Sequence, residues 1–275
     1  MNAAERQRPR PGELYLDHVS HFVPDLDAAA HLLQALGFAV TPRSDQIADG
    51  KPAGTSNRCV MLESGYLELL TPTADTPNAQ RMRSRMSMFI GVHLACFGTP
   101  DAEGEHARLA AHGFSPLPIV DLQRKVEGGT LRFKVVRVDP PMPEGRVQYV
   151  QHLTPELLWR KLDHHNGVVG LEAVYVCSGD VPADAARWAR FAGLLPHPGE
   201  NDVSLQTARG RVVIGGVEEI TRRLGAAPAA PALAGYALKC AEPRKFAARC
   251  RAAGLQVRGN AVMLPASLGG CWLLT

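Results

Sequence analysis

Three histidines lie in the stretch YLDHVSHFVPDLDAAAHLLQALGF, which covers residues 15–38. An imidazole can bind a metal ion through a ring nitrogen, or it can transfer a proton near neutral pH. A lone histidine is more often a solvated or packed side chain. Whether His18, His21 or His31 has a metal-binding or catalytic role therefore depends on the strand or helix that carries it.

Residues 16–23 form an apolar run that predicts a strand, and residues 26–36 predict a helix with apolar side chains at helical spacing. Gly37 stands where a left-handed residue ends such a helix. Side chains alternate across a strand, so His18 and His21 face opposite sides. We expect His21 to pack against the helix, and His31 to be solvated on the helix.

The order of strand, turn, helix and glycine recurs in residues 91–114, 171–194 and 235–255. After each helix come about three strand-like segments, among them RCVMLESGYLELL, which predicts a hairpin turning at Ser64 and Gly65. Each unit is thus a βαβββ module. One module cannot bury its sheet face alone, so we expect the modules to close on each other in pairs.

Four modules predict an α+β protein in two domains. The polar, arginine-containing residues 1–13 are expected to be a disordered tail. Residues 14–165 would form the N-terminal domain and residues 166–275 the C-terminal domain, with TPELLWRKLDHHNGVVG as the connector between them.

The composition bears on which classes of binding partner to expect. The net charge is +3 and the basic residues are scattered, so the sequence does not indicate nucleic-acid binding. No apolar run is long enough to cross a bilayer, so no membrane partner is expected. The six cysteines form no CxxC pair, which favours free thiols and a cytoplasmic protein. We expect a small-molecule substrate and leave a homodimer open.

The sequence resembles the vicinal oxygen chelate superfamily, and more narrowly its glyoxalase-like domain proteins. The resemblance rests on LDHVSHFVPDLDAAAHLLQALGF, GTSNRCVMLESGYLELLTP, GVHLACF and VQYVQHLTPELLW. It implies that the four βαβββ modules pair into two half-open barrels of the glyoxalase, bleomycin resistance and extradiol dioxygenase type. In this superfamily one divalent metal is bound by residues from the first and last strand of each module.

Carried onto this sequence, the resemblance implies His18, Glu68 and His93 as metal ligands. The fourth ligand is open between Gln151, which the LTP that follows both last strands selects, and His152, which is the better metal donor and is preferred. Imidazole and carboxylate donors suit zinc, nickel, manganese or ferrous iron.

Three further residues are expected to face a ligand. Asn57 and Arg58 open the strand that pairs with the strand of Glu68, and Arg124 lies in VDLQRKVEGG, which we interpret as a flap. A guanidinium near the site would favour an anionic substrate such as a carboxylate.

The resemblance implies a metal-dependent lyase or isomerase that stabilises an enediolate-like charge, with Glu68 as the base. A site of only His18, Glu68 and His93 would instead suit ferrous iron and a dioxygenase of the extradiol type. A third hypothesis is a binding protein that sequesters a small molecule without turnover.

The C-terminal modules lack these donors. Alignment places Ala173 where His18 stands and Ala237 opposite His93. Because alanine has no donor atom, we expect one metal per chain, in the N-terminal half.

Overall fold

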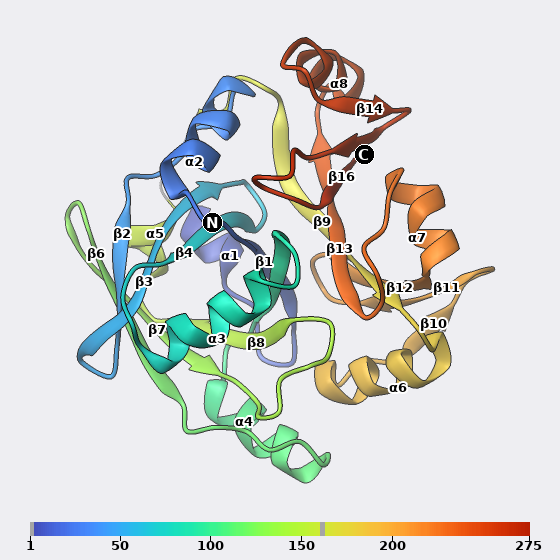
Figure 1. Cartoon of the computed structure of the whole chain (residues 1–275). Helices are drawn as coiled ribbons and strands as arrows, with labels where there is room; N and C mark the ends of the chain where they lie inside the picture. The colour runs from blue at the N-terminus through green and yellow to red at the C-terminus, as the bar shows by residue number, and fades with distance from the viewer. Residues whose placement is uncertain (1–2, 160–162) are drawn as a thin grey trace.

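The computed structural model describes residues 3–159 and 163–275. Its strands form two eight-stranded sheets with helices around them, as Figure 1 shows. The first half of the chain lies at the left of that view and the second half at the right. This arrangement confirms the α+β class that was predicted from the four repeats.

The first sheet closes into a barrel with the strand order β1-β4-β3-β2-β6-β7-β8-β5. Its strands are β1 (Tyr15–Phe22), β2 (Ser44–Ala48), β3 (Lys51–Met61), β4 (Tyr66–Pro72), β5 (Gly91–Gly98), β6 (Val120–Val126), β7 (Gly129–Val136) and β8 (Arg146–His152). Each of its two modules has one helix after the first strand, α2 (Leu26–Ala35) or α4 (Ala102–Ala111). The helices α3 (Pro77–Met86) and α5 (Pro155–Leu158) follow β4 and β8.

Local signals start and end the module helices. The Asp25 carboxylate accepts hydrogen bonds from the backbone N–H groups of Asp27 and Ala28, and Asp101 does the same for Gly104. Such capping satisfies backbone donors that have no partner within the helix. Gly37, next to the end of α2, has a φ of 88°, which a side chain would strain.

The second sheet has the order β10-β11-β12-β9-β13-β16-β15-β14 and does not close. Its strands are β9 (Val168–Ser178), β10 (Pro196–Pro198), β11 (Asp202–Gln206), β12 (Arg211–Gly216), β13 (Ala232–Cys240), β14 (Gln256–Arg258), β15 (Ala261–Met263) and β16 (Cys271–Leu274). Helices α6 (Val181–Ala192) and α8 (Pro243–Ala252) complete the two βαβββ modules. All four predicted modules are therefore confirmed.

An additional helix, α7 (Val217–Leu224), covers the face of the second sheet that corresponds to the barrel interior. Its buried Ile220 and Leu224 share one apolar cluster with sheet residues. The sheet members include Ala173, Tyr175, Val213, Ala237 and Cys271. The helix occupies the space in which a second barrel would have its cavity.

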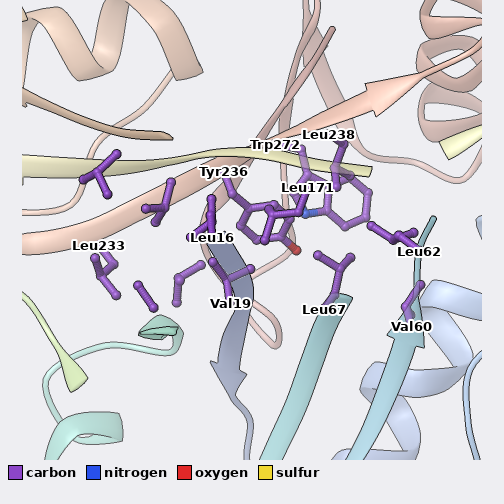
Figure 2. Close-up of a cluster of buried hydrophobic side chains, with 14 of the residues drawn as sticks. Leu16, Val19, Val60, Leu62, Leu67, Leu171, Leu233, Tyr236, Leu238 and Trp272 are labelled. Carbon is purple, nitrogen blue, oxygen red and sulfur yellow. The ribbon is translucent and has the colours of Figure 1, made fainter. Parts of the chain in front are cut away.

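The two sheets pack through the outer face of the barrel (Figure 2). The contact belongs to one continuous apolar cluster. Barrel residues Leu16, Val19, Val60 and Leu67 lie opposite Leu171, Leu233, Tyr236, Leu238 and Trp272 of the second sheet. Burial of this face stabilises both halves as one unit, because apolar area leaves water on each side.

His21 contributes a polar contact to this junction. Its Nδ1 lies 3.0 Å from the Leu268 carbonyl oxygen, and its Nε2 lies 2.9 Å from the Tyr236 hydroxyl. The side chain points out of the barrel, as strand alternation predicted. It packs on the C-terminal half, however, and not on the helix that follows β1.

The N-terminal segment differs from the disordered tail that its composition predicted. Residues Ala3–Gln7 form α1, and the Gln7 side chain is buried. Its amide donates to the Glu63 carbonyl and accepts a hydrogen bond from Arg209. These partners belong to other parts of the fold, so composition alone could not indicate them.

Within the described ranges, no helix is both long and apolar enough to cross a membrane.

Candidate functional site

A polar cavity of about 30 Å³ lies inside the barrel. Its lining combines ionisable and amide side chains from several strands, among them His18, Asn57, Glu68, Arg124, Arg137, Arg146 and Gln148. Such a concentration of polar groups inside a barrel indicates a site for chemistry or binding.

Strand register decides which residues of the two modules are equivalent. In the first module, β1 runs parallel to β4, and Ser20 stands opposite Glu68. In the second module, β5 runs parallel to β8, and Cys96 stands opposite Gln148. His18 and Leu94 lie two residues before Ser20 and Cys96. The second-module equivalents of His18 and Glu68 are therefore Leu94 and Gln148.

The structure does not bring His93 to the other expected ligands. Leu94 lines the cavity instead, and His93 lies on the opposite face of β5. The His93 Nε2 is 2.8 Å from the Phe89 carbonyl oxygen. Matching GVHL to LDHV is thus offset by one residue from the register of the strands, and one residue changes the face.

The two residues proposed for the fourth ligand lie outside the cavity lining. Gln151 holds the start of α4, because its Oε1 accepts from the Ala102 N–H at 3.2 Å and its Nε2 donates to the Pro100 carbonyl at 2.7 Å. His152 is on the same face of β8 as Gln148, at the end of the strand. Its Nε2 is 3.0 Å from Asp17 Oδ2.

Asp17 is a completely buried carboxylate that joins two histidines. Its Oδ1 lies 2.7 Å from His18 Nδ1 and its Oδ2 contacts His152. Burial acts to raise the pKa of Asp17, but the neighbouring His152 and His18 outweigh it and hold that pKa well below its ordinary value. Sequence reasoning missed Asp17. The available signal was an aspartate within an apolar strand, where carboxylates are rare without a partner.

Asp17 also controls His18. Burial acts to lower the pKa of His18, but the Cys96 thiol and the Asp17 carboxylate beside it raise that pKa well above its ordinary value. The ring stacks on Tyr66 with 4.3 Å between centroids, and its Nε2 lies 3.9 Å from Glu68 Oε2. With its Nδ1 turned toward Asp17, the His18 ring presents Nε2 to Glu68 at the wall of the cavity.

Glu68 is fixed by hydrogen bonds from three strands. Its Oε2 accepts from the Ser20 hydroxyl, and its Oε1 accepts from Asn57 Nδ2 at 2.5 Å and from Gln46 Nε2 at 3.4 Å. Donors on β1, β2 and β3 therefore hold both oxygens in one orientation.

Three arginines give the cavity its charge. The buried Arg124 donates from Nη1 to Asn57 Oδ1 at 3.2 Å. Arg137 donates to Gln148 Oε1 at 3.1 Å, and Arg146 donates to Asn78 Oδ1 at 3.1 Å. No ion pair found among the described residues involves any of these three. Their acceptors are neutral amides, so the guanidinium charges are not balanced by carboxylates in direct contact.

Burial and neighbouring cations lower the pKa of two of these arginines, Arg146 and Arg137. Burial, and then the neighbouring Arg137 and Arg81, lower the pKa of Arg146 to about 9. Burial and Arg81 also lower the pKa of Arg137. Guanidinium groups still keep their proton at neutral pH. The cavity is consequently a place where an anion would be stabilised.

Sequence reasoning missed Arg137 and Arg146. Arg146 and Gln148 are two residues apart, and this spacing places side chains on the same face of a strand.

Of the three residues expected to face a ligand, Asn57 and Arg124 line the cavity, whereas Arg58 does not. The Arg58 Nη2 is 2.7 Å from Asp27 Oδ1 on α2, on the outside of the barrel. Arg124 lies in β6, which pairs with β2 and β7, so the segment interpreted as a flap is part of the barrel wall.

The residues present do not fit the expected four-ligand metal centre. Only His18 and Glu68 of the four converge, and no group of three or more His, Cys, Asp or Glu side chains in the described part of the chain is arranged to hold a metal ion. Both Glu68 oxygens already accept hydrogen bonds.

Comparisons with solved structures place the fold. A hypothetical protein from Staphylococcus aureus is 12% identical, with a TM-score of 0.67 over 95% of this chain and 98% of that chain. The Mn(II)-bound glyoxalase from Novosphingobium aromaticivorans is 12% identical, with a TM-score of 0.58 over 95% of this chain and 81% of its own.

A mutant 4-hydroxymandelate synthase from Streptomyces coelicolor is 15% identical, with a TM-score of 0.59 over 92% of this chain and 77% of its own. Identities this low show that these chains share a fold. The comparison with curated proteins finds no match. A family model described as a glyoxalase-like domain matches residues 16–192, which is more than half of the sequence. The chain therefore belongs to the glyoxalase-like domain family.

Proposed function

We propose that the protein is a glyoxalase-like enzyme that binds a small anionic substrate inside the barrel and moves a proton on it with Glu68 and His18. One observation carries the proposal: three guanidinium groups, those of Arg124, Arg137 and Arg146, line the cavity together with a single carboxylate, that of Glu68. A guanidinium that is withdrawn from water, as that of the buried Arg124 is, is costly unless a counter-charge accompanies it. The substrate would supply that charge.

Each residue has a separate role in this proposal. Arg137 and Arg146 bind the carboxylate of the substrate, because a planar guanidinium matches the geometry of two carboxylate oxygens. His18 donates a hydrogen bond to the adjacent carbonyl oxygen, while Asp17 fixes the ring. Glu68 takes the proton from the carbon on the other side of that carbonyl, which leaves an enolate, and returns the proton to it. Return of the proton to a different face or atom makes the reaction an isomerisation, and departure of a leaving group from the enolate would make it a lyase reaction.

A metal-dependent enzyme is the second candidate, and one distance favours it. His18 Nε2 and Glu68 Oε2 approach to 3.9 Å at the wall of the cavity. Zinc, nickel, manganese or ferrous iron would polarise a substrate oxygen there, and ferrous iron would also allow a dioxygenase. Elemental analysis of protein purified without chelators separates this candidate from the first, since a resident metal would be present at unit stoichiometry.

Hydrogen exchange with deuterated water tests the proposed proton transfer directly. Pyruvate and other small 2-oxo acids are incubated with the protein in D₂O, and loss of the C3 proton signal is followed by NMR. The wild type should accelerate exchange, and Glu68→Gln should slow it by about 10²–10⁴-fold, which is the usual contribution of a general base.

The matched control is Glu63→Gln, which changes an exposed glutamate just before β4 and should retain wild-type exchange. Exchange that persists at the wild-type rate in Glu68→Gln would contradict the proposed role of Glu68. Binding of the acids without exchange of any of them would favour the third hypothesis, a protein that sequesters its ligand.

A further inference from the structure

A second cavity adjoins the first, and Arg124 lines both. The second cavity has a volume of about 240 Å³. Apolar side chains form much of its wall, namely those of Val40, Pro42, Met61, Val126, Leu131 and Leu157. Apart from the buried Arg124, its charged members are Arg43, Lys125 and Glu127, which are exposed and form the rim.

The residues of β7 show how the two cavities are aligned. Leu131 lines the second cavity, Phe133 and Val135 line the first, and Arg137, just after the strand, lines the first as well. These residues alternate along one face, so the path from Leu131 to Arg137 covers six residues, or about 20 Å at the rise of a strand. One end of this path is apolar and the other is cationic, with Arg124 between them.

Arg124, which lines both cavities, contacts neutral groups. Its Nη1 lies 3.2 Å from Asn57 Oδ1 and 3.5 Å from Cys59 Sγ, and its guanidinium carbon lies 5.8 Å from the centre of the Phe133 ring. None of the ion pairs in the described ranges holds it. Arg124 lines both cavities, so a ligand that extends from Arg137 and Arg146 past its side chain enters the second cavity.

We propose that the substrate is an amphipathic acid, whose carboxylate lies at Arg137 and Arg146 and whose unbranched apolar chain extends past Arg124 into the second cavity. This inference rests on the proposed function, because it takes the anionic group of the substrate from there. An apolar chain suits the wall of the second cavity, since each methylene group that leaves water for such a site gains about fourfold in affinity.

Calorimetric titration of straight-chain 2-oxo acids, from pyruvate to 2-oxooctanoate, tests the inference. In the wild type the dissociation constant should fall by about fourfold for each added methylene until the second cavity is filled. Val126→Trp fills that cavity from its wall and should abolish the gain with chain length while keeping the affinity for pyruvate. Val120→Trp, on the same strand but outside both linings, is the matched control and should keep the gain.

The outcomes separate this inference from the proposal on which it rests. If pyruvate binds and longer acids bind no better, the inference is overturned and the anion site stands. If none of the acids binds, the proposed function fails and the inference fails with it. A chain-length gain that survives in Val126→Trp also overturns the inference. Val40→Phe replaces that variant if circular dichroism shows that the tryptophan disturbs folding, and the same results are then decisive.

Discussion

His18 of the barrel and Ala173 of the second sheet occupy the same position in their modules. His18 stands opposite Tyr66 on the parallel neighbour, and Ala173 stands opposite Arg211. Two residues along, Ser20 faces Glu68, whereas Tyr175 faces Val213. The positions of His18 and Glu68 in the barrel thus correspond to Ala173 and Val213 in the second sheet, which have no ionisable side chain.

The difference follows from what covers each sheet. The barrel closes on itself and leaves polar side chains around a cavity, while α7 covers the second sheet with Ile220 and Leu224. Unpaired charged groups inside a protein lower the free energy of unfolding, whereas apolar packing raises it. We infer that the second half supplies stability, through its own core and through the junction in Figure 2, that the charged barrel alone would lack.

The largest expected effect is on the buried Asp17, whose counterpart in the second sheet, Glu172, is partly exposed and pairs with Arg211. Asp17→Asn removes the carboxylate that joins His18 and His152. Breaking a buried charged pair from one side costs about 3–5 kcal/mol of unfolding free energy. Urea denaturation measures it.

Asp27→Asn is the matched control, because the Asp27 side chain is 57% exposed where it pairs with Arg58. An exposed ion pair contributes up to about 1 kcal/mol. Equal losses in the two variants would show that the Asp17 network is no more than an ordinary polar contact.

A smaller loss should come from the cover of the second sheet. Ile220→Ala truncates a completely buried side chain of α7, which should cost about 2–5 kcal/mol through lost burial and the cavity left behind. Pyruvate binding in the barrel should not change, as the second sheet has no part in it.

Val217→Ala is the control on the same helix, where the side chain is 47% exposed and the cost should stay within about 0.5 kcal/mol. If Ile220→Ala retains its fold but loses pyruvate binding, the separation of roles between the two halves is wrong.

The smallest effect is expected from metal removal. The four-ligand centre is not assembled, so prolonged dialysis against EDTA should leave pyruvate binding and the C3 exchange rate unchanged. A loss of exchange that one added metal restores, and that His18→Ala abolishes, would establish the metal-dependent candidate instead.

The module pattern could be predicted because its signals are local. Asp25, Asp101 and Asp180 each cap a helix through their own side chain, and Gly193 ends α6 with a φ of 65°. Such contacts lie within a few residues of sequence, so one strand, helix and turn can be inferred without knowledge of the rest of the fold.

The side chains that line the cavity depend on strand register, which is set by contacts between residues far apart in the sequence. β1 and β5 pair with irregularities between Leu16 and His18 and between Ser20 and His21. A shift of one residue reverses the face of every side chain, which is why His93 was expected in the cavity and Leu94 occupies it. Arg137 and Arg146 could not be distinguished from solvated surface arginines, because only closure of the barrel brings them to the same cavity as Glu68.

The most direct test of the cationic barrel site is calorimetric titration of pyruvate into Arg146→Met. Methionine keeps the apolar length of the side chain and removes the charge, so unfolding free energy should be unchanged or raised while pyruvate affinity falls by about 10 to 100-fold. Arg211→Met, in the second sheet, is the matched control and should bind like the wild type. Equal pyruvate affinity in the wild type and in Arg146→Met would contradict the assignment of this cavity as the anion site.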